Sequence, residues 1–473
     1  MIDYAVVGSG IGGSTIAAYL HAKGYKTILF EKEPYLGGCS STFTHHGYRY
    51  NTGATTFVGY QEGHPLKEIF DTIGVQPTLI PTEPAITVIH NGKRTSRYKD
   101  LDRFLKELHA NYPHSHHDDF WKLVHQLNDS FYKIEGYYYS NRSKIKKLTS
   151  LLSYIPLLLK FRKYLQGDAL KFIERFYGEL SKEYLQFLEA QIFIVTQASL
   201  KEVNFLTAAL ALGYTFNKTY TIPGGFSALF EQLTKGMDQV KRSTTIQKIE
   251  KQEWGYLLHT KTQTYKAKQI ILNSTIYDSQ KLFEDQKIRS YYAKYKPLDN
   301  HQSSFMLYMT IKSDRTFNHH YQLIQAQRYP YTISNALFVS FSTKGDTAMA
   351  PQGHYSITAS IHTDTRYWED ESAYENQKER LQQELVKSIC DILDIQFDQI
   401  VDQFTATPKT FQRYIHRSQL GGNAMTIKNF LPKLPSNDTP IQGLYHVGDT
   451  VYAAQGWPGV MMGVKNLTRM LNV

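Results

Sequence analysis

The sequence contains only two cysteines, Cys39 and Cys390, in a chain of 473 residues. Two distant cysteines form neither a disulfide framework nor a CxxC metal pair, so a reducing compartment is expected. The N-terminus lacks the charged, apolar and small-residue segments of a secretory signal. No stretch reaches the roughly 18 consecutive apolar residues that a membrane-spanning helix needs. These absences predict a cytoplasmic protein, with peripheral attachment to the inner face of the membrane as an open alternative.

Charge and composition exclude disorder and argue against nucleic acid as a partner. Hydrophobic residues make up 41% and charged residues 20% of the chain, which is typical of a globular protein. The net charge is +10, but the basic residues form no long run. The densest cluster, at residues 142–147, directly precedes an apolar stretch at residues 148–160. That stretch fits a core helix or a helix lying in the headgroup zone of a membrane, and its basic neighbours favour a membrane surface.

The first 31 residues have the pattern of a β-loop-α-β unit. Residues 4–7 predict a buried strand, residues 14–23 a helix that ends at Gly24, and residues 26–30 a second strand. The loop between the first strand and the helix fits G-x-G-x-x-G. In such a loop the first glycine allows the turn, the second admits a pyrophosphate and the third lets helix and strand pack closely. Glu31 follows the second strand at the spacing of a carboxylate that accepts from ribose hydroxyls. A glutamate rather than an arginine at this position argues against a 2′-phosphate on the nucleotide.

The next segments separate FAD from NAD through a family resemblance. Glu31-Lys32 is followed by Gly37-Gly38-Cys39-Ser40 and by a glycine-bounded hairpin at residues 47–53. Three further segments, at residues 222–226, 270–274 and 407–422, belong to the same set of motifs. The tail adds V-G-D at 447–449 and W-P-G at 457–459. This set resembles the phytoene desaturase, carotenoid isomerase and retinol saturase family of FAD-dependent oxidoreductases. The sequence departs from the family at Asn51, where an aspartate is usual, and this puts one polar contact in doubt.

The resemblance implies which residues hold FAD. Asp449 resembles the acceptor of the ribityl chain, and a residue near Ile246 resembles the backbone contact to adenine. The N–H groups of Val460 and Met461 would face the flavin ring at the start of the last helix, where negative charge builds on reduction. The predicted cofactor-binding set is Gly8, Ser9, Gly10, Ile11, Gly12, Gly13, Glu31, Lys32, Gly37, Gly38, Cys39, Ser40, Ile246, Gly448, Asp449, Gly459, Val460 and Met461.

The pattern of segments predicts an α/β fold with a discontinuous cofactor domain. Residues 1–75, 215–290 and 410–473 are assigned to a Rossmann-type FAD-binding domain that resembles glutathione reductase. Residues 76–214 and 291–409 are assigned to an inserted α+β substrate domain, mostly helical over residues 101–210, which is also the part expected at a membrane. The His-rich segment at residues 114–119 is interpreted as a loop leading into a helix, and no metal is predicted.

The resemblance also implies a class of substrate. Family members desaturate, saturate or isomerise long conjugated isoprenoids, so an apolar lipid or carotenoid is the expected ligand. A polyene offers no acidic proton to a strong base, and no catalytic residue is named. No second glycine fingerprint follows another strand, which argues against an NADPH domain and leaves a quinone, oxygen or a partner protein as the electron acceptor. Two alternatives stay open: a flavin amine oxidase acting on a small amine, and a non-catalytic lipid-binding flavoprotein.

Overall fold

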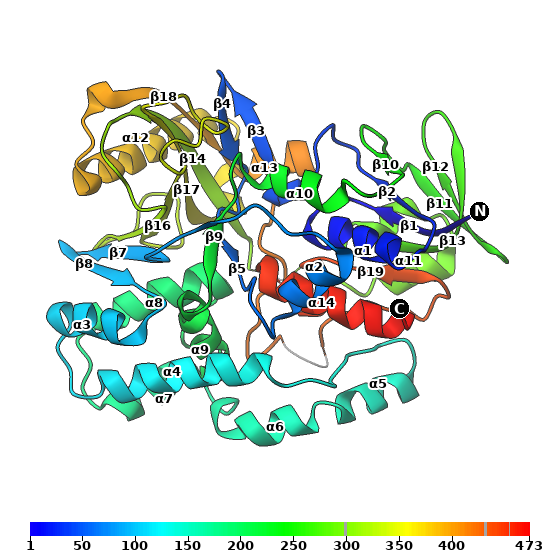
Figure 1. Cartoon of the computed structure of the whole chain (residues 1–473), viewed down its shortest axis with the longest axis horizontal. Coiled ribbons are helices and arrows are strands. Elements are labelled where there is room, and N and C mark those ends of the chain that lie inside the picture. The colour runs from blue at the N-terminus through cyan, green and yellow to red at the C-terminus, as the bar shows by residue number, and fades with distance from the viewer. Residues whose placement is uncertain (298–299, 430–432, 454) are drawn as a thin grey trace.

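A seven-stranded sheet brings together the two ends and the middle of the chain (Figure 1). The computed structural model describes all residues except 298–299, 430–432 and 454. In this sheet β1 pairs in parallel with β2 and β13, and β13 also pairs in parallel with β19. The strands, in spatial order, are β10 (Val240–Lys241), β2 (Thr27–Phe30), β1 (Ile2–Val7), β13 (Thr264–Leu272), β12 (Gly255–His259) and β11 (Lys248–Gln252), with β19 (Leu444–His446) beside β13. Assembly from separated segments is thus confirmed, whereas the domain boundaries stay a prediction.

Glycines determine how the chain leaves β1 and enters helix α1 (Ile11–Ala22). Gly8 has a φ of +97°, a conformation that residues with a Cβ rarely adopt. A Cβ on Gly13 would lie 1.9 Å from the carbonyl oxygen of Gly8, so only glycine allows the helix to pack this closely on the turn. The helix begins at Ile11, before the predicted start at residue 14, because the last glycines of the loop already form its first turn.

A second seven-stranded sheet lies beside the first and is largely antiparallel. Helix α12 (Tyr374–Leu393) covers one face, where its leucines and isoleucines join a core with the strands. The two longest strands, β14 and β17, pair along their whole length. The strand order is β18 (Ile400–Ala406), β14 (Gln302–Lys312), β17 (His354–Asp364), β16 (Ala336–Phe341), β15 (His320–Ile324), β7 (Ile86–His90) and β8 (Lys93–Arg97).

A layer of helices lies below the second sheet in Figure 1 and confirms the helical character predicted for residues 101–210. Arg97 is fully buried in the core of this layer. Its guanidinium group lies 4.4 Å from the ring centroids of Phe104 and Trp121. The helices are α3 (Leu101–Asn111), α4 (His117–Tyr132), α5 (Lys144–Leu152), α6 (Ile155–Phe161), α7 (Ala169–Tyr177), α8 (Lys182–Thr196) and α9 (Phe205–Gly213).

Smaller elements connect these parts. They are the hairpin β3 (Thr42–His45) and β4 (Tyr48–Asn51), the three-stranded sheet of β5 (Phe57–Val58), β9 (Thr219–Thr221) and β6 (Ile80–Pro81), and the helices α2 (Pro65–Ile73), α10 (Phe226–Thr234), α11 (Gln286–Tyr292), α13 (Pro408–Ile415) and α14 (Gly456–Leu471). Helix α14, the last helix, packs against α1 and α2.

The apolar stretch at residues 148–160 is neither one helix nor a core helix. It divides into the end of α5 and the start of α6, where Pro156 occupies the first turn. Leu157 is buried, but Leu148 and Leu159 are 61% and 66% exposed. Within the part of the chain that the structure describes, no helix is long and apolar enough to cross a bilayer. The stretch therefore presents an apolar surface rather than a span.

Candidate active site

A cavity of about 1420 Å³ extends from the glycine loop to the helical layer. At one end its wall contains the β1–α1 loop and Glu31, and at the other it contains Leu157 and Leu158 of α6. Residues of β14, β16 and β17 form another part of the wall. The cavity thus joins elements that the sequence analysis assigned to two different domains.

The nucleotide end combines free backbone donors with a buried carboxylate. No side chain caps α1, whose N-cap residue is Gly10, and the first amides of a helix lack intrahelical partners. They are suited to an anion such as a pyrophosphate. Glu31 is 7% exposed, and its Oε2 accepts from the N–H and the hydroxyl of Ser9 at 2.8 and 2.6 Å. Ser9 therefore fixes the carboxylate beside the loop, where ribose hydroxyls could bind.

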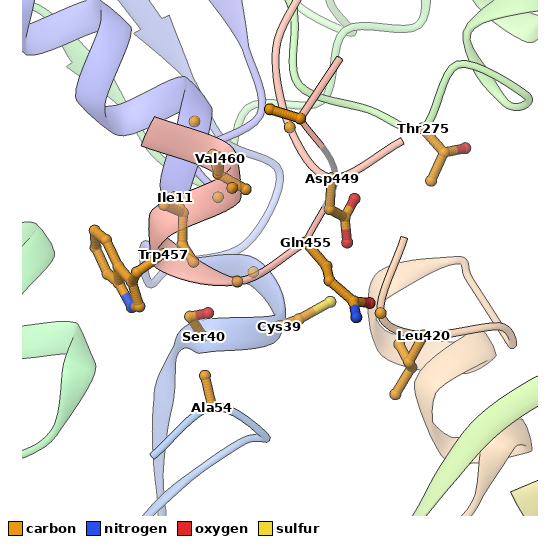
Figure 2. A pocket seen from close by; sticks show the side chains of 18 of the residues that line it. Ile11, Cys39, Ser40, Ala54, Thr275, Leu420, Asp449, Gln455, Trp457 and Val460 are labelled. Carbon is orange, nitrogen blue, oxygen red and sulfur yellow. The ribbon is translucent and has the colours of Figure 1, made fainter. Parts of the chain in front are cut away.

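A second helix begins at the same cavity. Gln455 is the N-cap residue of α14, and its side chain donates to the carbonyl oxygen of Val195 at 2.6 Å instead of capping the helix. Figure 2 shows Asp449, Gln455 and Cys39 around one space, with the first turn of α14 beside the segment that carries Cys39 and Ser40. Burial raises the pKa of the Cys39 thiol, which favours its neutral form at pH 7.

An ion pair completes this part of the wall. Arg417 Nη1 lies 3.1 Å from both carboxylate oxygens of Asp449. Burial works against the charged guanidinium, but the Asp449 carboxylate raises the pKa of Arg417 above its ordinary value. Arg417 therefore stays cationic beside the predicted ribityl position. The sequence motifs did not identify it, because it lies in a loop 32 residues before its partner.

The structure places nearly all the predicted cofactor residues in the wall of this cavity. The two exceptions are Gly13, which packs on Gly8 as its motif predicts, and Met461. The Met461 side chain is fully buried in the core with α1, in the second turn of α14, and the role of its N–H group stays a prediction. The residues that line the cavity are Gly8, Ser9, Gly10, Ile11, Gly12, Glu31, Lys32, Gly37, Gly38, Cys39, Ser40, Ile246, Gly448, Asp449, Gly459 and Val460.

Ile246 lines the cavity from the loop before β11. The antiparallel pairing of β11 with β12 begins at Lys248, opposite His259. Before it, the N–H of Thr244 donates to the carbonyl oxygen of Glu31 at 2.8 Å. This bond keeps the residues around Ile246 at the nucleotide edge and out of the strand.

Asn51, which stands where the family usually has an aspartate, makes two hydrogen bonds through its side-chain oxygen. Its Oδ1 accepts from the N–H of Phe226 at 3.0 Å and from the hydroxyl of Thr42 at 2.9 Å. The first of these bonds caps α10, which begins at the end of the motif at residues 222–226. An amide oxygen therefore makes the helix-capping contact that a carboxylate oxygen could also make.

The rest of the wall is formed by apolar and aromatic side chains from several helices. The hydroxyl of Tyr154 donates to that of Tyr452 at 2.5 Å, which ties α6 to the loop before α14. Sequence reasoning missed these residues, because no local motif links positions that are brought together only by tertiary packing. The group comprises Phe131, Tyr132, Tyr137, Leu151, Tyr154, Leu157, Leu158, Leu165, Leu206, Leu210, Tyr214, Leu420 and Tyr452.

The histidines that the sequence analysis considered as ligands lie outside this cavity wall. Within the described ranges, His45, His46 and Asp402 form a group whose ligand atoms lie within 4.8 Å of one another. In the segment at residues 114–119, His117 is buried and contacts the hydroxyl of Tyr177 at 3.1 Å. Asp118 pairs with His109 at 2.6 Å and lies inside the first turn of α4, whose N-cap residue is His116. An interpretation of Asp118 and Asp119 as the helix cap is therefore wrong.

These features define a flavin-dependent oxidoreductase: a Rossmann-type sheet, a glycine turn with its buried glutamate, and a second helix N-terminus facing the same cavity. The chain belongs to the family of flavin containing amine oxidoreductases, whose model matches residues 11–464. FAD is accordingly its cofactor. The residues present fit FAD, since two helices without side-chain caps and the carboxyl groups of Glu31 and Asp449 border one space.

Curated relatives support the resemblance found in the sequence. The chain is 26% identical over 489 residues to the prolycopene isomerase of Daucus carota, covering 96% of this chain and 77% of the relative. It is 22% identical to the 1-hydroxycarotenoid 3,4-desaturase of Flavobacterium sp. strain P99-3, covering 97% of each. The solved structure of an oxidoreductase from Methanosarcina mazei matches with a TM-score of 0.62 at 17% identity, covering 99% of this chain and all of the other. The structural match shows the fold alone.

Proposed function

We propose that this enzyme uses FAD to transform a long conjugated isoprenoid, by desaturation, saturation or cis–trans isomerisation. The observation that carries the proposal is the cavity, which continues from the nucleotide end into a wall of leucines and tyrosines. Its volume of about 1420 Å³ exceeds the roughly 300–1,000 Å³ of an ordinary small-molecule pocket. That room suits a dinucleotide together with an extended apolar chain. The printed activities of the isomerase and desaturase relatives support this class of substrate.

The side chains of this protein would bind and orient the reactants. Bound flavin supplies hydride or electron transfer, which no side chain provides. The amides that open α14 lie at the positive end of the helix dipole and would stabilise negative charge that develops nearby. Asp449 would accept from the ribityl chain, and Glu31 from the ribose. The apolar wall excludes water from the polyene and leaves it to be held by shape and dispersion.

A turnover experiment with the FAD-loaded protein tests the proposal. The protein is incubated without oxygen with a poly-cis carotene or, in parallel, with putrescine, and products are separated by chromatography while flavin absorbance is recorded. Conversion of the carotene and no reaction with the amine is the expected result. Flavin reduction by the amine alone would identify an amine oxidase. No conversion of any carotene and no change in flavin absorbance, together with lipid in the purified protein, would identify a lipid-binding flavoprotein.

We further propose that α5 and α6 rest on a membrane from which the substrate enters. Leu158 lines the cavity and is also 48% exposed, so the cavity reaches the surface at α6. Six large apolar side chains are exposed on this surface, which is flanked by exposed lysines and an arginine. An apolar face with basic flanks suits the headgroup zone of an anionic bilayer. The apolar group is Ile145, Leu148, Leu152, Ile155, Leu158 and Leu159, and the basic group is Lys144, Lys146, Lys160, Arg162 and Lys163.

The free thiols of Cys39 and Cys390 support a cytoplasmic location for this surface. A membrane site would also give access to a quinone as electron acceptor. Anaerobic turnover that depends on an added quinone would support that acceptor, and turnover that depends on oxygen would replace it.

A further inference from the structure

Strands β14 and β17 place three polar side chains beside Met306 in the wall of the cavity. In the antiparallel register Ser304 pairs with His362, and Met306 pairs with Ser360. Directly paired residues share a face of the sheet, and so do residues two apart along a strand. Ser304, Ser360 and His362 therefore lie on one face, and all three line the cavity. The alternate residues Phe305 and Ile361 lie on the other face, in the core beneath α12.

In the described part of the chain, three polar side chains on this face lack protein partners, whereas Tyr308 and Thr358 on the same face donate to backbone oxygens. Within the described ranges, no hydrogen bond joins the Ser304 hydroxyl, the Ser360 hydroxyl or the His362 ring to another protein group. Their neighbours on the opposite face differ, since the Ser303 hydroxyl donates to the Ser418 carbonyl oxygen and that of Thr363 to the Tyr331 carbonyl oxygen. Ser304 and Ser360 are only partly buried, so their hydroxyls and the His362 ring are open to a ligand or to water in the cavity, which can supply these bonds.

His362 is the most informative of the three residues. It is 6% exposed, and the ring of Phe193 packs edge-on against it at a centroid distance of 5.0 Å. Burial lowers the pKa of His362 to about 4, so the imidazole is neutral at pH 7 and carries one donor and one acceptor. A neutral imidazole and two hydroxyls recognise a hydroxyl or carbonyl group. They provide no cation for a carboxylate.

We infer that the substrate carries an oxygen function, a hydroxyl or a carbonyl, at the end that enters the cavity first. This inference rests on the proposed function and adds the chemistry of the end group. Helices α5 and α6 lie at the lower edge of the molecule in Figure 1, whereas β14 and β17 lie at its upper left, and the same cavity borders all four. A chain that enters at α6 and extends toward these strands brings its leading end to Ser304, Ser360 and His362.

Binding of two matched polyenes to the FAD-loaded protein tests the inference. The probes are lycopene and 1-hydroxylycopene, each titrated in the same detergent, and Kd is obtained from the quenching of tryptophan fluorescence. The wild-type protein should bind the hydroxylated polyene about tenfold more tightly, the effect of one or two well-formed hydrogen bonds. His362→Phe should bring the two Kd values to within about twofold of each other, since the apolar ring removes the donor and the acceptor.

His354→Phe is the matched control. His354 begins the same strand but lies outside the cavity wall, where its Nδ1 contacts the carbonyl oxygen of Gln352 at 3.2 Å. This variant should keep the wild-type preference. If His362→Phe loses FAD, the Ser304→Ala/Ser360→Ala double variant, a smaller change, gives the deciding comparison.

The outcomes separate this inference from the proposed function. Equal Kd values for the two polyenes in the wild-type protein would overturn the inference and leave the proposed function intact. A preference that persists in both the His362→Phe and the double variant would also overturn it. Failure of the FAD-loaded protein to bind either polyene would overturn the proposed function and the inference with it.

Discussion

Arg417 and Asp449 form an ion pair in the cavity wall, with Arg417 Nη1 3.1 Å from each carboxylate oxygen. The side chains are 17% and 26% exposed, so both are partly screened from water. Asp449 is also the predicted acceptor of the ribityl chain, and its contact with Arg417 fixes the position of that carboxylate in the cavity wall. This relationship gives Arg417 a positioning role.

Asp449→Asn should weaken FAD binding. The amide removes the charge that pairs with Arg417 and replaces one acceptor oxygen by a donor, so the dissociation constant for FAD should rise about tenfold or more. Arg417→Met should have a smaller effect in the same direction, because Asp449 loses only its orienting partner. Fluorescence titration of the apoprotein with FAD measures both. Arg413→Met, an exposed change in the preceding helix, is the control. Unchanged FAD affinity in Asp449→Asn would remove Asp449 from the site.

Gly13→Ala should destabilise the protein, although Gly13 itself lies outside the cavity wall. The new Cβ would lie 1.9 Å from the carbonyl oxygen of Gly8, so α1 must shift away from the β1 turn. Such overpacking costs about 1–3 kcal/mol of unfolding free energy, and the displaced amides should bind FAD more weakly. Urea denaturation and FAD titration measure the two effects. Gly236→Ala is the matched control, since nothing lies within 4 Å of its added Cβ. Equal stability of the two variants would contradict the packing role.

Local motifs explain why the nucleotide end could be predicted from the sequence. The turn at Gly8, the start of α1 and Glu31 lie within one β-loop-α-β unit, where spacing along the chain fixes spacing in the structure. The start of α14 shows the limit of this reasoning. The W-P-G motif indicated a helix start but not its first residue, which is Gly456.

The substrate end could not be predicted in the same way. His362 lies beside Ser304 only through the β14–β17 register, and both line the same cavity as Leu158 only through the packing of the helical layer. No pattern in the sequence encodes the distance between such segments. The exposed surface of α5 and α6 could not be predicted either, because a run of apolar residues does not reveal which of its side chains remain exposed.

Acid should destabilise the protein through buried neutral histidines. Burial lowers the pKa of His446 to about 3, well below the ordinary value of 6.5. Between pH 6.5 and 3 the unfolded chain therefore binds a proton at this position that the folded protein does not, and stability falls as pH falls. From pH 6.5 to 5.5 one such histidine costs about 1 kcal/mol.

The variant His446→Gln isolates this contribution. Glutamine can keep the bond to the hydroxyl of Tyr292, which lies 2.6 Å from His446 Nε2, but it does not titrate. Urea denaturation at pH 6.5 and 5.5 should show a loss of stability about 1 kcal/mol smaller in the variant than in the wild-type protein. The same loss in both would mean that His446 does not titrate differently in the folded and unfolded chain.

The surface of α5 and α6 should bind anionic vesicles through both its apolar and its basic residues. Leu159 is 66% and Leu148 is 61% exposed, and a carboxylate at either position opposes insertion into the headgroup zone. The Leu148→Glu/Leu159→Glu variant should therefore lose at least about tenfold in partition to vesicles that contain phosphatidylserine, while its FAD content stays unchanged. Binding of the wild-type protein should weaken as salt rises, because the basic residues act through screened electrostatics.

Phe397→Glu is the control for this surface. Phe397 is 62% exposed but lies between α12 and β18, beside the second sheet rather than the helical layer. If exposed apolar area alone drove vesicle binding, this variant would lose partition as strongly as the Leu148→Glu/Leu159→Glu variant. Retention by Phe397→Glu and loss by the double variant would locate the contact at α5 and α6, next to the mouth of the cavity. Vesicle binding by the double variant at the wild-type level would show that the substrate reaches the cavity by another route.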